Sequence, residues 1–199
     1  MRVLSKEESQ KLVSYLTVDT DKYKFGIFLA LYTGIRVGEL CALQWKDLSF
    51  SDKTLHISKT MQRLQKVEQN EEKKTHVIVA EAKSQSSHRL IPLPDFILEM
   101  ASQYKQSPNC YIISTSRGKF IEPRVMQYQF KKCMEACGIK NVNFHALRHT
   151  FATRCIEAGF DIKTLSEILG HSSVKITLDK YVHSSLELKR INMEKLRMI

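Results

Sequence analysis

The sequence is poor in several features that mark special classes of protein. Its 199 residues include only 7 Gly and 4 Pro, too few for a low-complexity or collagen-like chain. No apolar run approaches the ~20 residues that cross a membrane, and the polar first residues predict no signal peptide. The 5 cysteines form no Cys-x-x-Cys pair, which disfavours a disulfide framework and predicts a reduced, cytoplasmic protein. With 43% hydrophobic residues, the chain is expected to fold as a globular domain.

Acidic residues are also scarce relative to basic ones. The chain has 31 Lys+Arg and 21 Asp+Glu, which gives a net charge of +10. Residues 117–154 carry 8 basic and 2 acidic residues, so most of the excess lies in one segment. Such a patch favours nucleic acid as a partner, because it can neutralise backbone phosphates; a merely soluble basic protein is the alternative. The candidate nucleic-acid contacts in this segment are Arg117, Lys119, Arg124, Lys131 and Lys132.

The hydrophobic pattern predicts an α+β fold, mainly helical, with a small antiparallel β-sheet at one edge. A capping box at Ser5-x-x-Glu8 marks the first helix. Helices are expected over residues 5–16, 23–32, 36–43, 94–104, 123–137, 145–158, 161–169 and 173–182. Strands are expected over residues 54–58, 76–82 and 88–93, the last two joined as a hairpin by residues 83–87. The polar residues 62–74 predict an exposed loop or the tip of a hairpin.

The most informative segment reads His145-Ala146-Leu147-Arg148-His149. On a helix, the two histidines and the arginine share one face. The arginine offers a planar pair of donors to phosphate oxygens, and His145 can donate a hydrogen bond or move a proton. A zinc metalloprotease would need glutamate at position 146, so the alanine there argues against a zinc site. The segment therefore predicts a phosphate site.

Four further segments carry residues that suit the same chemistry. His171 follows a helix-ending glycine, and Tyr181 lies ten residues later. A phenol has a pKa of about 10, so it attacks phosphorus only when cations stabilise the phenolate and the pentacoordinate charge. Arg36 follows a glycine turn, with Glu39 at i+3 to orient it, and Lys83 lies at the expected hairpin tip. Two arginines, a lysine and two histidines around one phosphate would activate the phenol without a metal.

Five segments together resemble the signature boxes of the tyrosine recombinase (integrase) family. They read TGIRVGELCALQW, EAKSQSSHRLIPL, HALRHTFAT, LGHSS and LDKYVH, in the order that the family has them. The resemblance covers about residues 4–183 and implies site-specific DNA cutting and rejoining through a 3′-phosphotyrosyl intermediate, with no metal, ATP or other cofactor. The Lys- and Ser-rich hairpin is similar to those of integrases from conjugative transposons and Gram-positive phages, which implies a phage or another mobile element as source.

The resemblance implies a cationic clamp. Arg36 matches the first catalytic arginine of the family and Arg148 the second, and both would hold the scissile phosphate. Glu39 matches an acidic residue that supports the first arginine. All three are present in this sequence.

The resemblance also implies proton-transfer groups and a nucleophile. Lys83 matches the hairpin lysine that acts as general acid toward the leaving 5′ oxygen. His145 matches an acid/base and hydrogen-bonding residue, and His171 matches the second histidine of the family. Tyr181 matches the nucleophile. His149 has no counterpart in this set, and we interpret it as a buried, hydrogen-bonded structural residue.

The resemblance further implies double-stranded DNA as substrate, a homo-tetramer on that DNA and room for an accessory directionality protein. Residues 1–183 would form the catalytic domain. Residues 184–199 would form a C-terminal tail that docks on a neighbouring subunit in trans, or packs in cis. Family members usually carry a helical DNA-clamping domain before the catalytic one, so the length predicts a catalytic fragment; a short single-domain inversion recombinase is the alternative.

Three other functions are open to this sequence. A type IB topoisomerase or a telomere resolvase would use the same chemistry with another outcome. A non-catalytic DNA-binding regulator would use only the helical C-terminal half. A metal-dependent nuclease is disfavoured, because the sequence has no carboxylate cluster suited to metal ions.

Overall fold

The structure, a computed structural model, describes residues 2–65, 75–81, 87–115, 118–181 and 193–194. The α-helices are α1 (Lys6–Thr17), α2 (Lys22–Thr33), α3 (Val37–Ala42), α4 (Asp95–Ser102), α5 (Pro123–Ala136), α6 (His145–Glu157), α7 (Ile162–Leu169) and α8 (Val174–Tyr181). A short 3-10 helix, η1 (Trp45–Asp47), follows α3. The strands are β1 (Leu48–Ser49), β2 (Thr54–Ile57), β3 (Lys59–Gln65), β4 (Thr75–Glu81) and β5 (Arg89–Pro92). The mainly helical α+β fold is thus confirmed, and each predicted helix ends within about two residues of its expected bounds.

Local signals account for the helix ends. Ser5 begins α1 with a complete capping box, and the Asp21 side chain accepts hydrogen bonds from two backbone N–H groups at the start of α2. Gly34 and Gly170 end α2 and α7 in the left-handed conformation, with φ of 65° and 64°. Both turns lie beside the site described below, because Arg36 comes two residues after Gly34 and His171 directly after Gly170.

The sheet arrangement differs from the expected one. β2 pairs with β5 and with β1 in one antiparallel sheet, whereas β3 pairs with β4 in a separate two-stranded ribbon. The predicted hairpin between residues 76–82 and 88–93 is therefore wrong, since β4 and β5 belong to different sheets. The register explains the choice: β2 sets the buried Leu55 directly opposite the buried Ile91 of β5, on the face that meets the core.

The loop expected over residues 62–74 is also partly wrong. Residues 62–65 extend β3 and pair with residues 75–78 of β4. Residues 62–64 are all exposed, and a ribbon exposed on both faces resembles a loop in composition. The remainder, residues 66–74, lies outside the described residues, as do residues 82–86 with Lys83.

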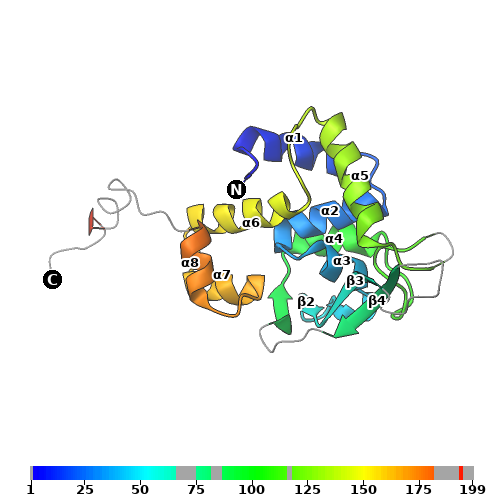
Figure 1. The fold of residues 1–199 in the computed structure, drawn as a ribbon. Helices are drawn as coiled ribbons and strands as arrows, with labels where there is room; N and C mark the ends of the chain where they lie inside the picture. Colours follow the sequence, from blue (N-terminus) through cyan, green and yellow to red (C-terminus); the bar gives the residue numbers. More distant parts are fainter. Residues whose placement is uncertain (1, 66–74, 82–86, 116–117, 182–192, 195–199) are drawn as a thin grey trace.

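Two apolar clusters hold the helices together. The larger one is centred on α2 and includes Phe25 and Leu29, with Phe130 of α5 and Ile91 of β5 packed around it. The smaller one lies between α6, α7 and α8 and consists of Ala152, Cys155, Leu165, Leu169 and Tyr181. Figure 1 shows α7 and α8 together at one end of α6, away from α1 and α5. The predicted nucleophile therefore belongs to the smaller cluster.

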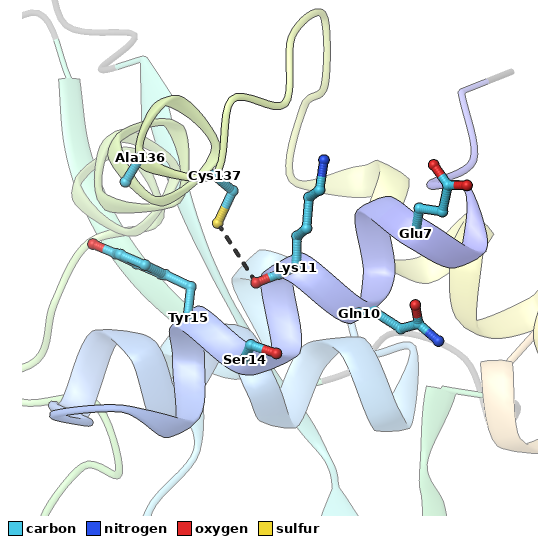
Figure 2. Close-up of a pocket in the computed structure, with 7 residues that line it drawn as sticks. All are labelled: Glu7, Gln10, Lys11, Ser14, Tyr15, Ala136 and Cys137. Atoms are coloured by element: carbon cyan, nitrogen blue, oxygen red, sulfur yellow. Dashed lines mark hydrogen bonds between the residues drawn. The ribbon is translucent and has the colours of Figure 1, made fainter.

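A hollow lies between α1 and the C-terminal end of α5 (Figure 2). In it the Cys137 thiol points toward the backbone carbonyl oxygen of Lys11, at 4.0 Å. Cys133, one turn earlier on α5, is buried, and burial raises the pKa of its thiol to about 11. All 5 cysteines are free thiols.

Among the described residues, no helix combines the length and the apolar character that a membrane span requires.

Candidate active site

Four of the six predicted catalytic residues line one open cavity of about 330 Å³. They come from the turn before α3, from the first two turns of α6 and from the turn between α7 and α8. Two serines, a lysine, an isoleucine and a glycine complete the wall. The lining residues are Arg36, Ser87, His145, Arg148, Gly170, His171, Ser172, Ile176 and Lys180.

Arg36 lies at the N-terminus of α3, where Glu39 holds it twice. Its Nη1 donates to Glu39 Oε1 at 2.7 Å, and its backbone N–H donates to Oε2 at 2.9 Å. The arginine side chain is 41% exposed, so its guanidinium faces the open cavity. The contact between Glu39 and Arg36 that was predicted is therefore present. In this pair the Glu39 carboxylate is buried and the Arg36 guanidinium is exposed.

Arg89 is a residue that sequence reasoning missed. It is the first residue of β5, and its Nη1 and Nη2 donate to the two oxygens of Glu39 at 3.2 and 2.8 Å. Its Nε also donates to the carbonyl oxygen of Ile168 at 2.6 Å, which ties β5 to α7. The available signal was its register: in the alternating strand RLIP, Arg89 shares the inward face with Ile91.

The pKa of Glu39 reflects this pairing. Burial alone would raise the pKa of the carboxyl, but the hydrogen bonds and charges of Arg89 and Arg36 hold it below its ordinary value. The group is therefore ionised at neutral pH. A fixed negative charge beneath the cavity keeps two guanidinium groups in place without filling the cavity itself.

Arg148 is almost completely buried at 2% exposure. Its Nη1 donates to the carbonyl oxygen of Gly34 at 2.8 Å, and its Nη2 donates to that of Leu169 at 2.7 Å. It therefore joins the ends of α2 and α7 to α6. Burial lowers the pKa of Arg148 to about 10, with Arg36 contributing, so the side chain remains cationic at neutral pH.

The two cavity histidines are held in a neutral form. His171 Nδ1 lies 2.8 Å from Oγ1 of the buried Thr177, which fixes its ring against α8. Burial lowers the pKa of His171 to about 4, and the charges of Arg148 and Lys180 add to the effect. Burial also lowers the pKa of His145, and the charges of Arg148 and Lys180 again add to the effect. A bound phosphate would offset the nearby positive charges and favour protonation of both rings.

Tyr181 is the last described residue of α8 and is 8% exposed. Its hydroxyl oxygen lies 2.9 Å from Nδ1 of His149, and the His149 ring meets the His145 ring edge to face at 4.5 Å. Its ring is nearly parallel to that of His171, with 6.4 Å between centroids. Burial raises the pKa of Tyr181, while Arg148 and Arg36 act in the opposite direction. The phenol thus lies beside the cavity, although it is not among the described residues that line it.

Other predicted residues lie elsewhere. Lys83 and Arg117 are outside the described residues. The remaining candidate DNA contacts are exposed, before or on α5, and none of them lines the cavity: Lys119, Arg124, Lys131 and Lys132. Lys180, which does line it, was missed; its position beside Tyr181 in the segment LDKYVH was the available signal. In the described ranges, no three metal-ligating side chains come together.

Comparison with known proteins places this geometry in context. A profile of the phage integrase family matches residues 2–187. A tyrosine recombinase XerC-like protein of Caldanaerobacter subterraneus subsp. tengcongensis is 29% identical over 199 residues, which cover 92% of this chain and 50% of the relative. Tyrosine recombinase XerA of Thermococcus onnurineus is 32% identical over 203 residues, which cover 98% of this chain and 63% of the relative.

The fold also matches that of a solved protein–DNA complex. The Tn1549 transposon integrase, in complex with a circular intermediate DNA, superposes with a TM-score of 0.80 and 25% sequence identity. The match covers 98% of this chain and 66% of the integrase chain. The present chain therefore spans about half to two thirds of the length of the relatives that it matches.

Proposed function

We propose, because the chain belongs to the phage integrase family, that it is the catalytic part of a site-specific DNA recombinase that uses Tyr181 as its nucleophile. One observation carries the proposal. Two arginine guanidinium groups and two neutral imidazole rings line one open cavity of about 330 Å³, and the phenol lies next to it. These four residues are Arg36, Arg148, His145 and His171.

The proposed reaction begins when a phosphate of double-stranded DNA enters the cavity. Arg36 and Arg148 hold its non-bridging oxygens and offset the charge that develops on phosphorus. Tyr181 Oη forms a bond to phosphorus and gives its proton to His145, the acid/base residue of the site, while the bond from phosphorus to the 5′ oxygen breaks. Lys83 gives a proton to that oxygen, and the DNA 3′ end remains attached to the tyrosine. A 5′ hydroxyl of a partner strand then reverses these steps.

The fixed positions of the two arginines explain why a weak nucleophile can react at this site. Arg148 is fixed by two carbonyl oxygens and Arg36 by Glu39, so neither needs to reorganise when charge develops. The bond to tyrosine conserves the energy of the phosphodiester. The proposed reaction therefore uses no ATP, no metal ion and no other cofactor.

The proposal includes the partners of the reaction. Double-stranded DNA is the substrate, which the DNA complex of the Tn1549 integrase supports. Strand exchange between two sites calls for a homo-tetramer on DNA, with residues 184–199 docking on a neighbouring subunit, and an accessory protein setting direction. Exposed lysines and arginines of segment 117–154 would contact backbone phosphates. The free thiols support a cytoplasmic location.

A nicked-duplex library tests the proposal. Its members carry a nick beside a randomised sequence, so that cleavage releases a short fragment and traps the protein on DNA. In EDTA, the chain is expected to form a denaturation-resistant adduct with some members, which sequencing identifies, and Tyr181→Phe forms none. An adduct that persists in Tyr181→Phe contradicts the assignment of the nucleophile. Relaxation of supercoiled DNA without joining of partner strands would instead indicate a type IB topoisomerase.

A further inference from the structure

The hydrogen bond between His149 and Tyr181 has no role in the reaction described above. The two residues are 32 positions apart, on α6 and α8, and their side chains meet at the hydroxyl that would attack phosphorus. His149 lies one turn after His145 and next to Arg148, so it shares a helix face with two residues that line the cavity.

The environment of Tyr181 makes this contact decisive for its orientation. The ring packs in the small cluster with Cys155, Leu165 and Leu169, and it is 8% exposed. Apolar contacts alone do not fix the direction of the hydroxyl, whereas a buried hydroxyl is destabilised when it lacks a hydrogen-bond partner. His149 Nδ1, at 2.9 Å, is the partner that selects one direction for the hydroxyl.

The groups around His149 keep it in the form that accepts a hydrogen bond. His145, Lys180 and Arg148 lie near it, and together with burial they lower its pKa to about 4. At neutral pH the ring is therefore uncharged and can present a lone pair at Nδ1. The hydroxyl of Tyr181 then donates to His149, while the positive charge of Arg148 acts on its oxygen.

We propose that His149 is a positioning residue for the nucleophile: its Nδ1 accepts the hydrogen bond of the Tyr181 hydroxyl and sets the direction from which that oxygen approaches the phosphate. The inference rests on the proposed role of Tyr181. It assigns to His149 a part in the chemical step and none in DNA affinity, because His149 is not among the described residues that line the cavity.

Two nearly isosteric substitutions, His149→Asn and His149→Leu, test the proposal. The Asn side chain places an oxygen acceptor near the position of Nδ1, whereas Leu has the same branching without an acceptor. On a duplex selected from the nicked library, single-turnover adduct formation is expected to fall about 100-fold in His149→Leu. In His149→Asn it should stay within a few-fold of the parent, while both variants keep the parent's Kd for DNA. Equal rates in the two variants, whether fast or slow, overturn the proposal.

A second measurement separates this inference from the proposed function. In protein labelled at tyrosine Cζ with ¹³C, Tyr181→Phe identifies the Tyr181 resonance. That resonance should move in His149→Leu and remain near its parent position in His149→Asn. If the parent forms no adduct but this pattern holds, the reaction assignment fails and the contact stands. If the resonance is the same in both variants, the contact itself is disproved.

Discussion

Glu39 and Arg89 form a two-point ion pair in which each side chain is 5% exposed. The same carboxylate also holds Arg36, which is exposed to the cavity, so a buried arginine and a cavity arginine share one acceptor. Arg36 is therefore held in position by the negative charge of Glu39, which is buried from solvent. Such a pair is tolerated because every one of its partners is present.

Removal of Arg89 is expected to destabilise the fold strongly. Arg89→Ala leaves the Glu39 charge buried with only Arg36 beside it, and should lower the free energy of unfolding by about 3–5 kcal/mol. The matched control is Lys53→Ala, which breaks the exposed pair between Lys53 and Asp95 and should change it by less than about 1 kcal/mol. Urea unfolding of both variants measures the difference; equal, small changes would contradict the prediction.

Removal of Arg36 and removal of Arg148 should have different effects on the free energy of unfolding. Arg36→Ala and Arg148→Ala are both expected to lose most adduct formation while keeping DNA binding. Only Arg148→Ala should also unfold more easily, by about 1–3 kcal/mol for each carbonyl oxygen that loses its donor, those of Gly34 and Leu169. Thermal melting beside the adduct assay checks this. A melting curve of Arg148→Ala that matches the parent would show that the carbonyl contacts contribute nothing.

Gly34 is expected to tolerate no side chain. An added Cβ would lie 2.6 Å from Cδ1 of Phe151 and 2.9 Å from Cδ2 of Leu169, at a residue with φ of +65°. Gly159, with φ of +83° and nothing within 4 Å, is the matched control for backbone strain alone. Gly159→Ala should lose about 1–2 kcal/mol, and Gly34→Ala about 1–3 kcal/mol more through overpacking. Chemical unfolding of the two variants decides whether the clash adds to the strain.

Stability should fall as the pH is lowered from about 6.5 toward 4. The pKa values of His149 and His171 are about 4 in the folded chain, against an ordinary value of 6.5. Between these values the unfolded chain binds more protons than the folded one, so acid favours unfolding, and above pH 6.5 this effect is absent. Unfolding free energies at pH 7.5 and pH 5 measure the decrease.

Asparagine variants identify the residues responsible for that decrease. His171→Asn should reduce the difference between the two pH values, whereas His56→Asn, at an exposed position on β2, should leave it unchanged. A decrease of full size in His171→Asn would assign the acid sensitivity to other groups.

The sequence was sufficient for the helices and for much of the site, because both depend on local signals. Capping residues and terminal glycines set the helix ends. The family resemblance pointed to Arg36, Arg148, His145 and His171, and these four residues line one cavity. Strand pairing was not predictable in the same way. Propensity shows that residues 76–81 and 89–92 are extended, but which strands pair depends on core packing across distant segments.

Two contacts of the site escaped the sequence for a related reason. Arg89 looks like a surface arginine until its register places it on the buried face beside Ile91, opposite a glutamate 50 residues away. The partner of His149 is a hydroxyl on another helix, and no spacing rule joins positions 32 residues apart. His149 was interpreted as a buried, hydrogen-bonded residue; the side chain makes a hydrogen bond but is only half-buried, and the sequence did not indicate its partner.

The division of the apolar residues into two clusters has a mechanical consequence. Arg36 is anchored through Glu39 beside the large cluster, whereas Tyr181 belongs to the small one, which is joined to the rest through α6 and through the bond from Arg89 to the Ile168 carbonyl. The position of the Tyr181 hydroxyl relative to the Arg36 guanidinium is therefore set by the contacts between the two clusters and not by either cluster alone.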